Sequence, residues 1–169
     1  MKKLTILALV PFFFLACGGG GGDGAVDYDE PEAAAVVLIE VEAPVPIPVP
    51  ELREVAGDDD WEAKAHNKNT EIIGVLNIIN PVATYIVAGF DQYGSNFSDV
   101  LQEEWADTQV QLTAATTLYV SCKERMATGE YNKKLFLDLE EVWQLLVKTG
   151  VAGVRTKSMV DAEVGNLKG

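Results

Sequence analysis

The chain has 169 residues, of which 13 are basic, 26 are acidic and one is a histidine, and its formal net charge is −13. A chain of this length fits one domain with a connecting segment. The acidic balance argues against nucleic acids and anionic lipid surfaces as partners, because phosphate binding requires clustered Lys and Arg side chains.

The N-terminus has the pattern of an export signal that ends at a cysteine. Lys2 and Lys3 form a positive segment, residues 4–15 form an apolar run, and Ala16 is the small residue before a cleavage site. The apolar run is too short to cross a hydrocarbon core of about 30 Å, which needs about 20 helical residues. We therefore expect a signal peptide at residues 1–16.

The end of this signal, Phe14-Leu15-Ala16-Cys17, resembles the lipobox of bacterial lipoprotein precursors, although leucine is more usual at its first position. The resemblance implies diacylation of the Cys17 sulfur, cleavage before Cys17 and acylation of the new amine. Several acyl chains make a stable anchor, whereas one chain binds a membrane reversibly. The alternatives are an ordinary secretory signal and an uncleaved anchor.

Gly18, and not aspartate, follows the cysteine, and in enterobacterial sorting this resembles an outer-membrane address. The resemblance therefore implies a lipid-anchored protein of the cell envelope. We expect the outer membrane, on its periplasmic or surface face, rather than the inner membrane.

Residues 17–60 are expected to be a flexible, acidic and proline-rich tether. Residues 18–60 contain twelve acidic side chains and one basic side chain, so most of the negative charge lies here. Residues 33–42 are apolar enough to form a short strand or a docking segment. Alternating prolines follow and favour polyproline II: Pro44, Pro46, Pro48 and Pro50. These prolines are either part of a spacer or a ligand for a partner's aromatic groove.

The helical pattern begins at Trp61. Apolar residues recur with a period of 3.6 residues from Ile72 to Phe90. Pro81 is expected to kink this helix or to divide it in two. The apolar stretch is nearly long enough to span a membrane, but Asn77 and Asn80 on one face fit a buried core helix better.

A second helix is predicted by a row of inward residues that alternate in steps of four and three. We call this row the 101–126 seam, and it comprises Leu101, Trp105, Thr108, Leu112, Ala115, Tyr119, Cys122 and Met126. Such spacing is typical of a long bundle helix, with a homo-oligomer through the Leu101–Met126 seam as the alternative. Because lipidation would consume Cys17, Cys122 has no partner for an internal disulfide, and its place in the seam predicts burial.

A third helix is predicted to end at Lys148-Thr149-Gly150, where a basic last turn meets a glycine. Its expected inward residues are Leu135, Phe136, Leu139, Val142, Trp143, Leu146 and Val147. Residues 151–169 are expected to form a C-terminal tail with at most a short helix near residues 158–164.

The fold class that follows is all-α. We expect a small antiparallel bundle of three main helices over residues 61–150, with at most a short fourth helix in the tail. Short connections between the predicted helices favour antiparallel neighbours.

The sequence offers no catalytic, cofactor or metal motif such as HExxH, CxxC or a P-loop. His66, just before the first expected helix, is expected to be exposed or capping. Residues 58–60 with Glu62 lack the spacing of a calcium loop and indicate a solvated charge run. Trp61, at the junction with the tether, is the tryptophan best placed to contact a partner. We therefore expect no enzyme.

Three functions remain as hypotheses. The leading one is an envelope lipoprotein whose helical domain binds a protein partner or assembles with itself. The second is a carrier of a small molecule or lipid, with an apolar cavity lined by Ile79, Ile86, Leu112 and Leu139. The third is a phage- or plasmid-encoded surface-exclusion lipoprotein, which shares the binding mechanism of the first.

Overall fold

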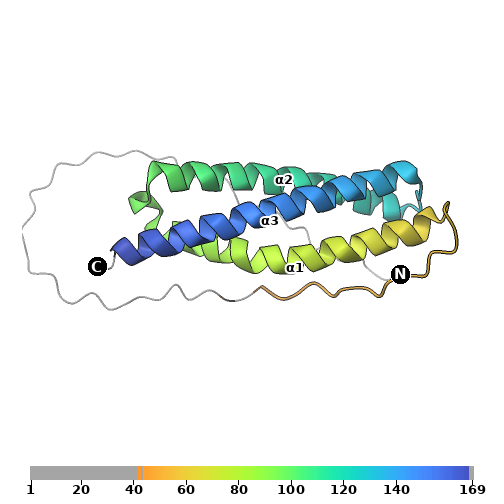
Figure 1. The fold of residues 1–169 in the computed structure, drawn as a ribbon, viewed down its shortest axis with the longest axis horizontal. Helices are drawn as coiled ribbons and strands as arrows, with labels where there is room; N and C mark the ends of the chain where they lie inside the picture. The colour runs from red at the N-terminus through yellow and green to blue at the C-terminus, as the bar shows by residue number, and fades with distance from the viewer. Residues whose placement is uncertain (1–41, 43, 168–169) are drawn as a thin grey trace, which may run out of the picture. The chain divides into compact units, whose positions relative to one another are not determined.

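The computed structural model describes residue 42 and residues 44–167. The predicted signal peptide, Cys17 and most of the apolar segment 33–42 lie outside the described residues. The described part contains three long helices and no strand: α1 (Trp61–Tyr93), α2 (Asp99–Ala127) and α3 (Lys133–Leu167), with a 3₁₀ turn, η1 (Gly94–Asn96), after α1 (Figure 1). The all-α prediction is confirmed.

Side-chain caps begin each helix where the chain turns. Asp60 Oδ1 accepts a hydrogen bond of 3.0 Å from the Ala63 amide at the start of α1. The Ser98 hydroxyl accepts from the Leu101 amide of α2, and Asn132 Oδ1 accepts from the Leu135 amide of α3. Each cap satisfies an amide that has no partner inside its own helix.

The helices run up, down and up, so α2 is antiparallel to both of its neighbours and α1 is parallel to α3 (Figure 1). The parallel pair is visible in its contacts, because Lys68 of α1 pairs with Glu140 of α3 and Tyr85, further along α1, bonds Asp161, further along α3. Helix α3 packs against both α1 and α2.

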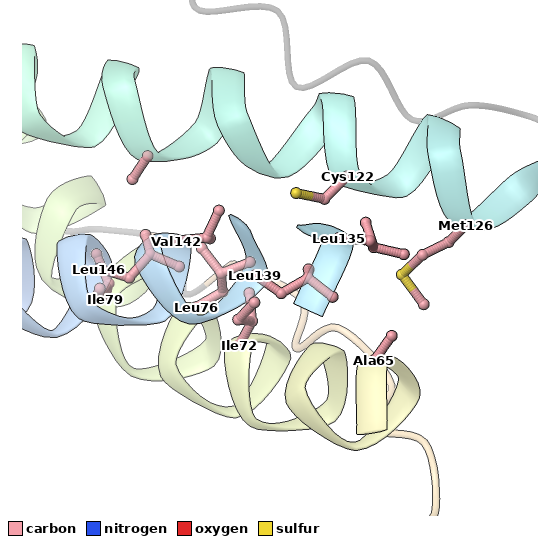
Figure 2. Close-up of a cluster of buried hydrophobic side chains, with 11 residues drawn as sticks. Ala65, Ile72, Leu76, Ile79, Cys122, Met126, Leu135, Leu139, Val142 and Leu146 are labelled. Carbon is pink, nitrogen blue, oxygen red and sulfur yellow. The ribbon is translucent and has the colours of Figure 1, made fainter. Parts of the chain in front are cut away.

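The core divides into two clusters along the bundle. The larger one collects buried side chains from all three helices, including Ile72 and Leu76 of α1, Cys122 of α2, and Leu139 and Leu146 of α3 (Figure 2). The smaller cluster lies near η1 and is made of Ile86, Phe97, Leu101, Trp105, Val160 and Val164. Helix spacing of three and four residues therefore produces the packing that the pattern predicted.

The 101–126 seam faces inward, as predicted. Cys122 is 1% exposed, and six of the eight seam residues are buried, while Leu112 and Tyr119 are half-buried. These side chains contact helices of the same chain. A dimer through this seam would therefore have to open the bundle.

The structure corrects the expected division of the first helix. Pro81 lies inside α1, which continues unbroken to Tyr93. Proline removes one amide donor, but Pro81 is exposed and the carbonyl that loses its partner, that of Asn77, can turn toward solvent. His66 accordingly lies within α1 and not before it.

The third helix does not end at Gly150. Helix α3 continues to Leu167, so residues 151–167 are its second half and neither a tail nor a separate fourth helix. Gly150 has this position because of packing: a Cβ there would lie 3.3 Å from Ile79 Cγ1. Only Gly129, after α2, has the positive φ (78°) of a helix-ending glycine among the described residues.

Helix α1 is also the one described helix long and apolar enough to cross a membrane, with a mean hydropathy of 1.7 over its most apolar window. One third of that window is buried inside the bundle. Length and composition alone do not separate a core helix from a membrane span.

Candidate functional site

The proline-rich segment before α1 is bound to that helix by two asparagines. We call residues 44–56 the strap. Asn77 accepts a hydrogen bond from the Ile47 amide and donates one to the Ile47 carbonyl, both at 2.8 Å. Asn67 makes the same pair with Arg53, at 2.7 and 2.8 Å. Each carboxamide thus bonds both the amide and the carbonyl of one strap residue, as the backbone of a neighbouring β-strand would.

The strap corrects the expectation of a flexible tether up to residue 60. Ile47 packs against the larger core cluster, and the strap runs antiparallel to α1 (Figure 1). Ile47 and Arg53 are six residues apart, which is two turns of polyproline II, so both face the helix. Pro46, Pro48 and Pro50 stay exposed, and their role as a partner's ligand remains a prediction.

Removing both carboxamides should release the strap. In Asn67→Ala/Asn77→Ala, four hydrogen bonds are lost, each worth about 0.5–1.5 kcal/mol. We expect hydrogen exchange of the Ile47 and Arg53 amides to accelerate while the helix amides of the core stay protected. Asn166→Ala, at an exposed position, is the matched control. Unchanged exchange at both strap amides would show that the strap is held by other contacts.

An apolar groove runs along the parallel pair of helices, and we call it the α1–α3 groove. Its volume is about 380 Å³. Its lining residues are Val75, Ile78, Ile79, Val82, Ala83 and Ile86 of α1, Trp105, Thr108 and Leu112 of α2, and Leu146, Val147, Thr149, Gly150, Val151, Gly153 and Val154 of α3. Almost every lining atom is apolar, so the groove suits an apolar occupant.

Glycines and valines on α3 give the groove its shape. Gly150 lets α3 approach Ile79 closely, because a Cβ there would lie 3.3 Å from Ile79 Cγ1, whereas a Cβ at Gly153 would make an ordinary contact of 3.6 Å with Val82. Larger side chains beside the glycines form the walls. Four of them are exposed: Ile78 at 70%, Val147 at 37%, Val151 at 70% and Val154 at 55%.

A cluster of charges lies where the groove ends toward the start of α1. Lys68 Nζ lies 2.7 Å from Glu71 and 2.9 Å from Glu140, and 5.1 Å from the centre of the Trp143 ring. Burial alone would lower the pKa of Lys68, but its hydrogen bonds to the two glutamates outweigh this effect and raise the pKa. Lys68 therefore stays charged and ties α1 to α3.

A second polar cluster joins the same helices at the other end. The Tyr85 hydroxyl donates to Asp161 Oδ1 at 2.6 Å, and Lys157 bonds Asp161 Oδ2 at 2.6 Å while lying 4.3 Å from the Tyr85 ring centre. The hydrogen bond to Asp161 raises the pKa of Tyr85 to about 12. Both clusters thus link α1 to α3, one through Glu140, before the α3 residues that line the groove, and one through Asp161, after them.

The raised pKa of Tyr85 predicts a loss of stability in alkali. Below pH 10 the phenol is protonated in both states, so the Asp161 bond contributes fully; between pH 10 and about 12 the unfolded state loses its proton first and stability falls. We expect the difference in unfolding free energy between wild type and Tyr85→Phe to shrink over this range, measured by urea unfolding. A constant difference would contradict the assignment.

The candidate site residues predicted from the sequence do not lie together in one site. Ile79, Ile86 and Leu112 line the α1–α3 groove, whereas Leu139 lies in the larger core cluster. Trp61 packs against Phe136, with ring centres 6.1 Å apart, and is half-buried.

His66 is also half-buried and lies 3.1 Å from the Tyr131 hydroxyl, and burial lowers its pKa. Within the described residues, no group of three or more His, Cys, Asp or Glu side chains could hold a metal.

The sequence reasoning missed the outer wall of the groove. Val151 and Val154 were assigned to a tail, and Val147 was expected to face inward, although it is 37% exposed. A signal existed, because 147, 151 and 154 continue the helical spacing of three and four past Gly150.

No family model, curated protein or solved structure matches this chain.

Proposed function

We propose that this protein is a lipid-anchored envelope lipoprotein of the outer membrane whose helical bundle binds a protein partner, without catalysis. Cys17 would carry the anchor, and the α1–α3 groove would hold the partner. The observation that carries the binding role is the convergence of four exposed large apolar side chains on one groove: Ile78, Val147, Val151 and Val154.

An amphipathic helix is the partner element that this groove favours. Helix α1 lines it from Val75 to Ile86, which is about 16 Å or three helical turns. A helix of that length presents apolar side chains at spacings of three and four residues, and such helices bind apolar grooves. Scattered apolar residues need no explanation, but a continuous apolar patch supports an interaction site.

A lipid or small-molecule carrier is the second candidate. It is supported by the apolar lining and by a volume of about 380 Å³, which falls in the range of about 300–1,000 Å³ for ligand sites. The exposed walls argue against it, because ligand sites enclose most of the ligand surface. Val151 and Ile78 are each 70% exposed, which suits a helix better than a small ligand.

The strap shortens the free tether between the proposed anchor and the bundle. If the anchor is at Cys17, about 27 residues separate it from Pro44, and a flexible chain of that length reaches about 26–31 Å. Releasing the strap adds the residues up to Asp60. The two asparagines of α1 therefore would limit how far the bundle stands from its membrane.

Site-specific cross-linking in cells tests the partner role. A photoreactive amino acid at Val151, in the groove, should give an adduct with a partner, whereas the same group at Val110 of α2, which is 69% exposed and outside the groove, should not. Val154→Asp should abolish the adduct, because a buried charge in an apolar interface is costly. Equal adducts at both positions, or none at Val151, would contradict the proposal.

A further inference from the structure

The two walls of the α1–α3 groove differ in charge. Helix α1 carries no charged side chain from Ile72 to Phe90, a range that includes all of its lining residues. On α3, the exposed Lys148 and Arg155 lie one turn before and one turn after Val151, which is the most exposed valine of that wall. One edge of the groove is therefore neutral, and the other is basic.

Both cations on this edge can take a further partner. Within the residues that the structure describes, Lys148 makes no hydrogen bond or ion pair. The Arg155 side chain is 70% exposed and lies 3.5 Å from Glu104. A pair so exposed contributes little, and the five N–H donors of an arginine leave room for a second carboxylate. Lys68 and Lys157, by contrast, are already bound by carboxylates.

The basic edge extends only as far as the groove. The lining residues of α3 begin at Leu146 and end at Val154, and the two cations lie within one or two residues of these limits. Seven residues before Lys148, on the same edge of α3, the exposed side chain is the acidic Glu141. Because the positive charge coincides with the apolar section, it belongs to the groove rather than to the surface of α3 in general.

We infer that the partner of this groove is an amphipathic helix with acidic side chains along one edge, the edge that faces α3. The inference rests on the proposed binding role and adds the chemistry of the partner. Lys148 and Arg155 are about 10 Å apart along the axis of α3. A helix lying beside α3 presents residues seven positions apart at the same spacing on one face, so two acidic residues at i and i+7 meet both cations.

Charge on one edge selects and orients the partner. Apolar contacts alone accept any amphipathic helix of suitable length. A helix whose acidic edge faced α1 would place carboxylates against apolar side chains such as Ile78, without a cation to pair with, and this is costly. Charges beside the apolar seam of coiled coils determine the choice of partner in the same way.

Shape separates a helix from an anionic lipid surface, which carries the same charge. The groove is concave, with a volume of about 380 Å³, and a rod can fill it. A flat bilayer would touch only the exposed walls, such as Ile78 and Val151, and would leave the floor of the groove empty. The concave shape therefore favours the helix.

Two synthetic peptides test the inference on the chain from residue 17 onward, carrying Cys17→Ser. Both are amphipathic, have the same apolar stripe and contain about 18 residues, which is long enough for a helix. One carries Glu at two positions seven apart on one edge, and the other carries Lys at the same positions. Fluorescence anisotropy should show about tenfold tighter binding of the Glu peptide, because two attractive pairs replace two repulsive ones. Added salt should reduce this difference.

Charge reversal assigns the preference to the two cations. Lys148→Glu/Arg155→Glu should bind the Lys peptide more tightly than the Glu peptide. Lys123→Glu/Lys134→Glu makes the same change of net charge at exposed positions outside the groove and should keep the wild-type preference. Val151→Asp should weaken the binding of both peptides, because Val151 is part of the groove wall. Circular dichroism should show the same helix content in all variants.

Several results would overturn the inference. Equal affinity of the wild type for both peptides would remove the charge selectivity but leave the groove as a helix site, so the proposed function would stand. Binding of neither peptide would contradict both proposals. A preference that Lys148→Glu/Arg155→Glu retained would exclude these cations as its cause. A wild-type dimer in sedimentation, or binding to phosphatidylglycerol vesicles, that the same variant abolished would assign the basic edge to a second copy or to lipid.

Discussion

Replacing Leu139 with alanine is expected to lower the free energy of unfolding by about 2–5 kcal/mol, because it removes buried atoms and leaves a cavity. Leu139 is 0% exposed and belongs to the larger core cluster, which holds side chains of all three helices. Figure 2 shows it between Leu76 of α1 and Val142 and Leu135 of α3. Urea unfolding followed by circular dichroism gives the measurement.

Leu137→Ala is the matched control, since it makes the same change two residues away on the same helix. Leu137 is 52% exposed, and substitutions at such sites usually change stability by less than about 0.5 kcal/mol. Similar losses of unfolding free energy in both variants would mean that the face of α3 carrying Leu139 is not the one that packs in the core.

Periodicity predicted the helices because burial here depends mainly on one face of each helix. The 101–126 seam and the inward residues Leu135, Leu139, Val142 and Leu146 are found where spacing placed them. Spacing alone was enough because side chains three and four residues apart lie on one face of any α-helix.

The end of α3 was predicted wrongly because a local stop signal was given more weight than the helical spacing that continues past it. A basic residue followed by glycine is typical of a helix end. At Gly150, however, the glycine leaves room for the side chain of Ile79, which is distant in sequence. Glycine inside a helix costs about 1 kcal/mol relative to alanine, and close packing of α1 against α3 offsets that cost. Tertiary contact therefore overrides the local preference.

The strap was missed for a related reason. A proline-rich, acidic sequence indicates an extended chain, and the strap is extended. Such a sequence does not indicate which part of the fold the extended chain contacts. Asn67 and Asn77 are ten residues apart on α1, and their carboxamides give the strap its register. Asparagine has low helix propensity, and its presence at two positions inside α1 was the one available signal that these residues serve a contact.

Replacing Cys17 with serine should move the protein from the membrane fraction to the soluble fraction, and this is the strongest expected effect on location. Each buried methylene adds about 0.8 kcal/mol to membrane binding, so the loss of two or three acyl chains removes the anchor almost completely. Fractionation of cells and the mass of the N-terminal peptide measure it. Cys122→Ala, which alters the one cysteine that the structure describes, should leave the protein at the membrane.

A Cys17→Ser protein that stayed at the membrane would contradict lipidation as the anchor and would direct attention to α1. That helix is apolar enough to span a bilayer, yet its face toward α3 carries Lys68, which is held by Glu71 and Glu140. Inserting α1 would break this cluster and expose Leu139 and the rest of the core, at a large cost in stability. The proposed acyl anchor would leave the bundle folded beside the membrane with its groove accessible, which is the arrangement that the proposed partner binding requires.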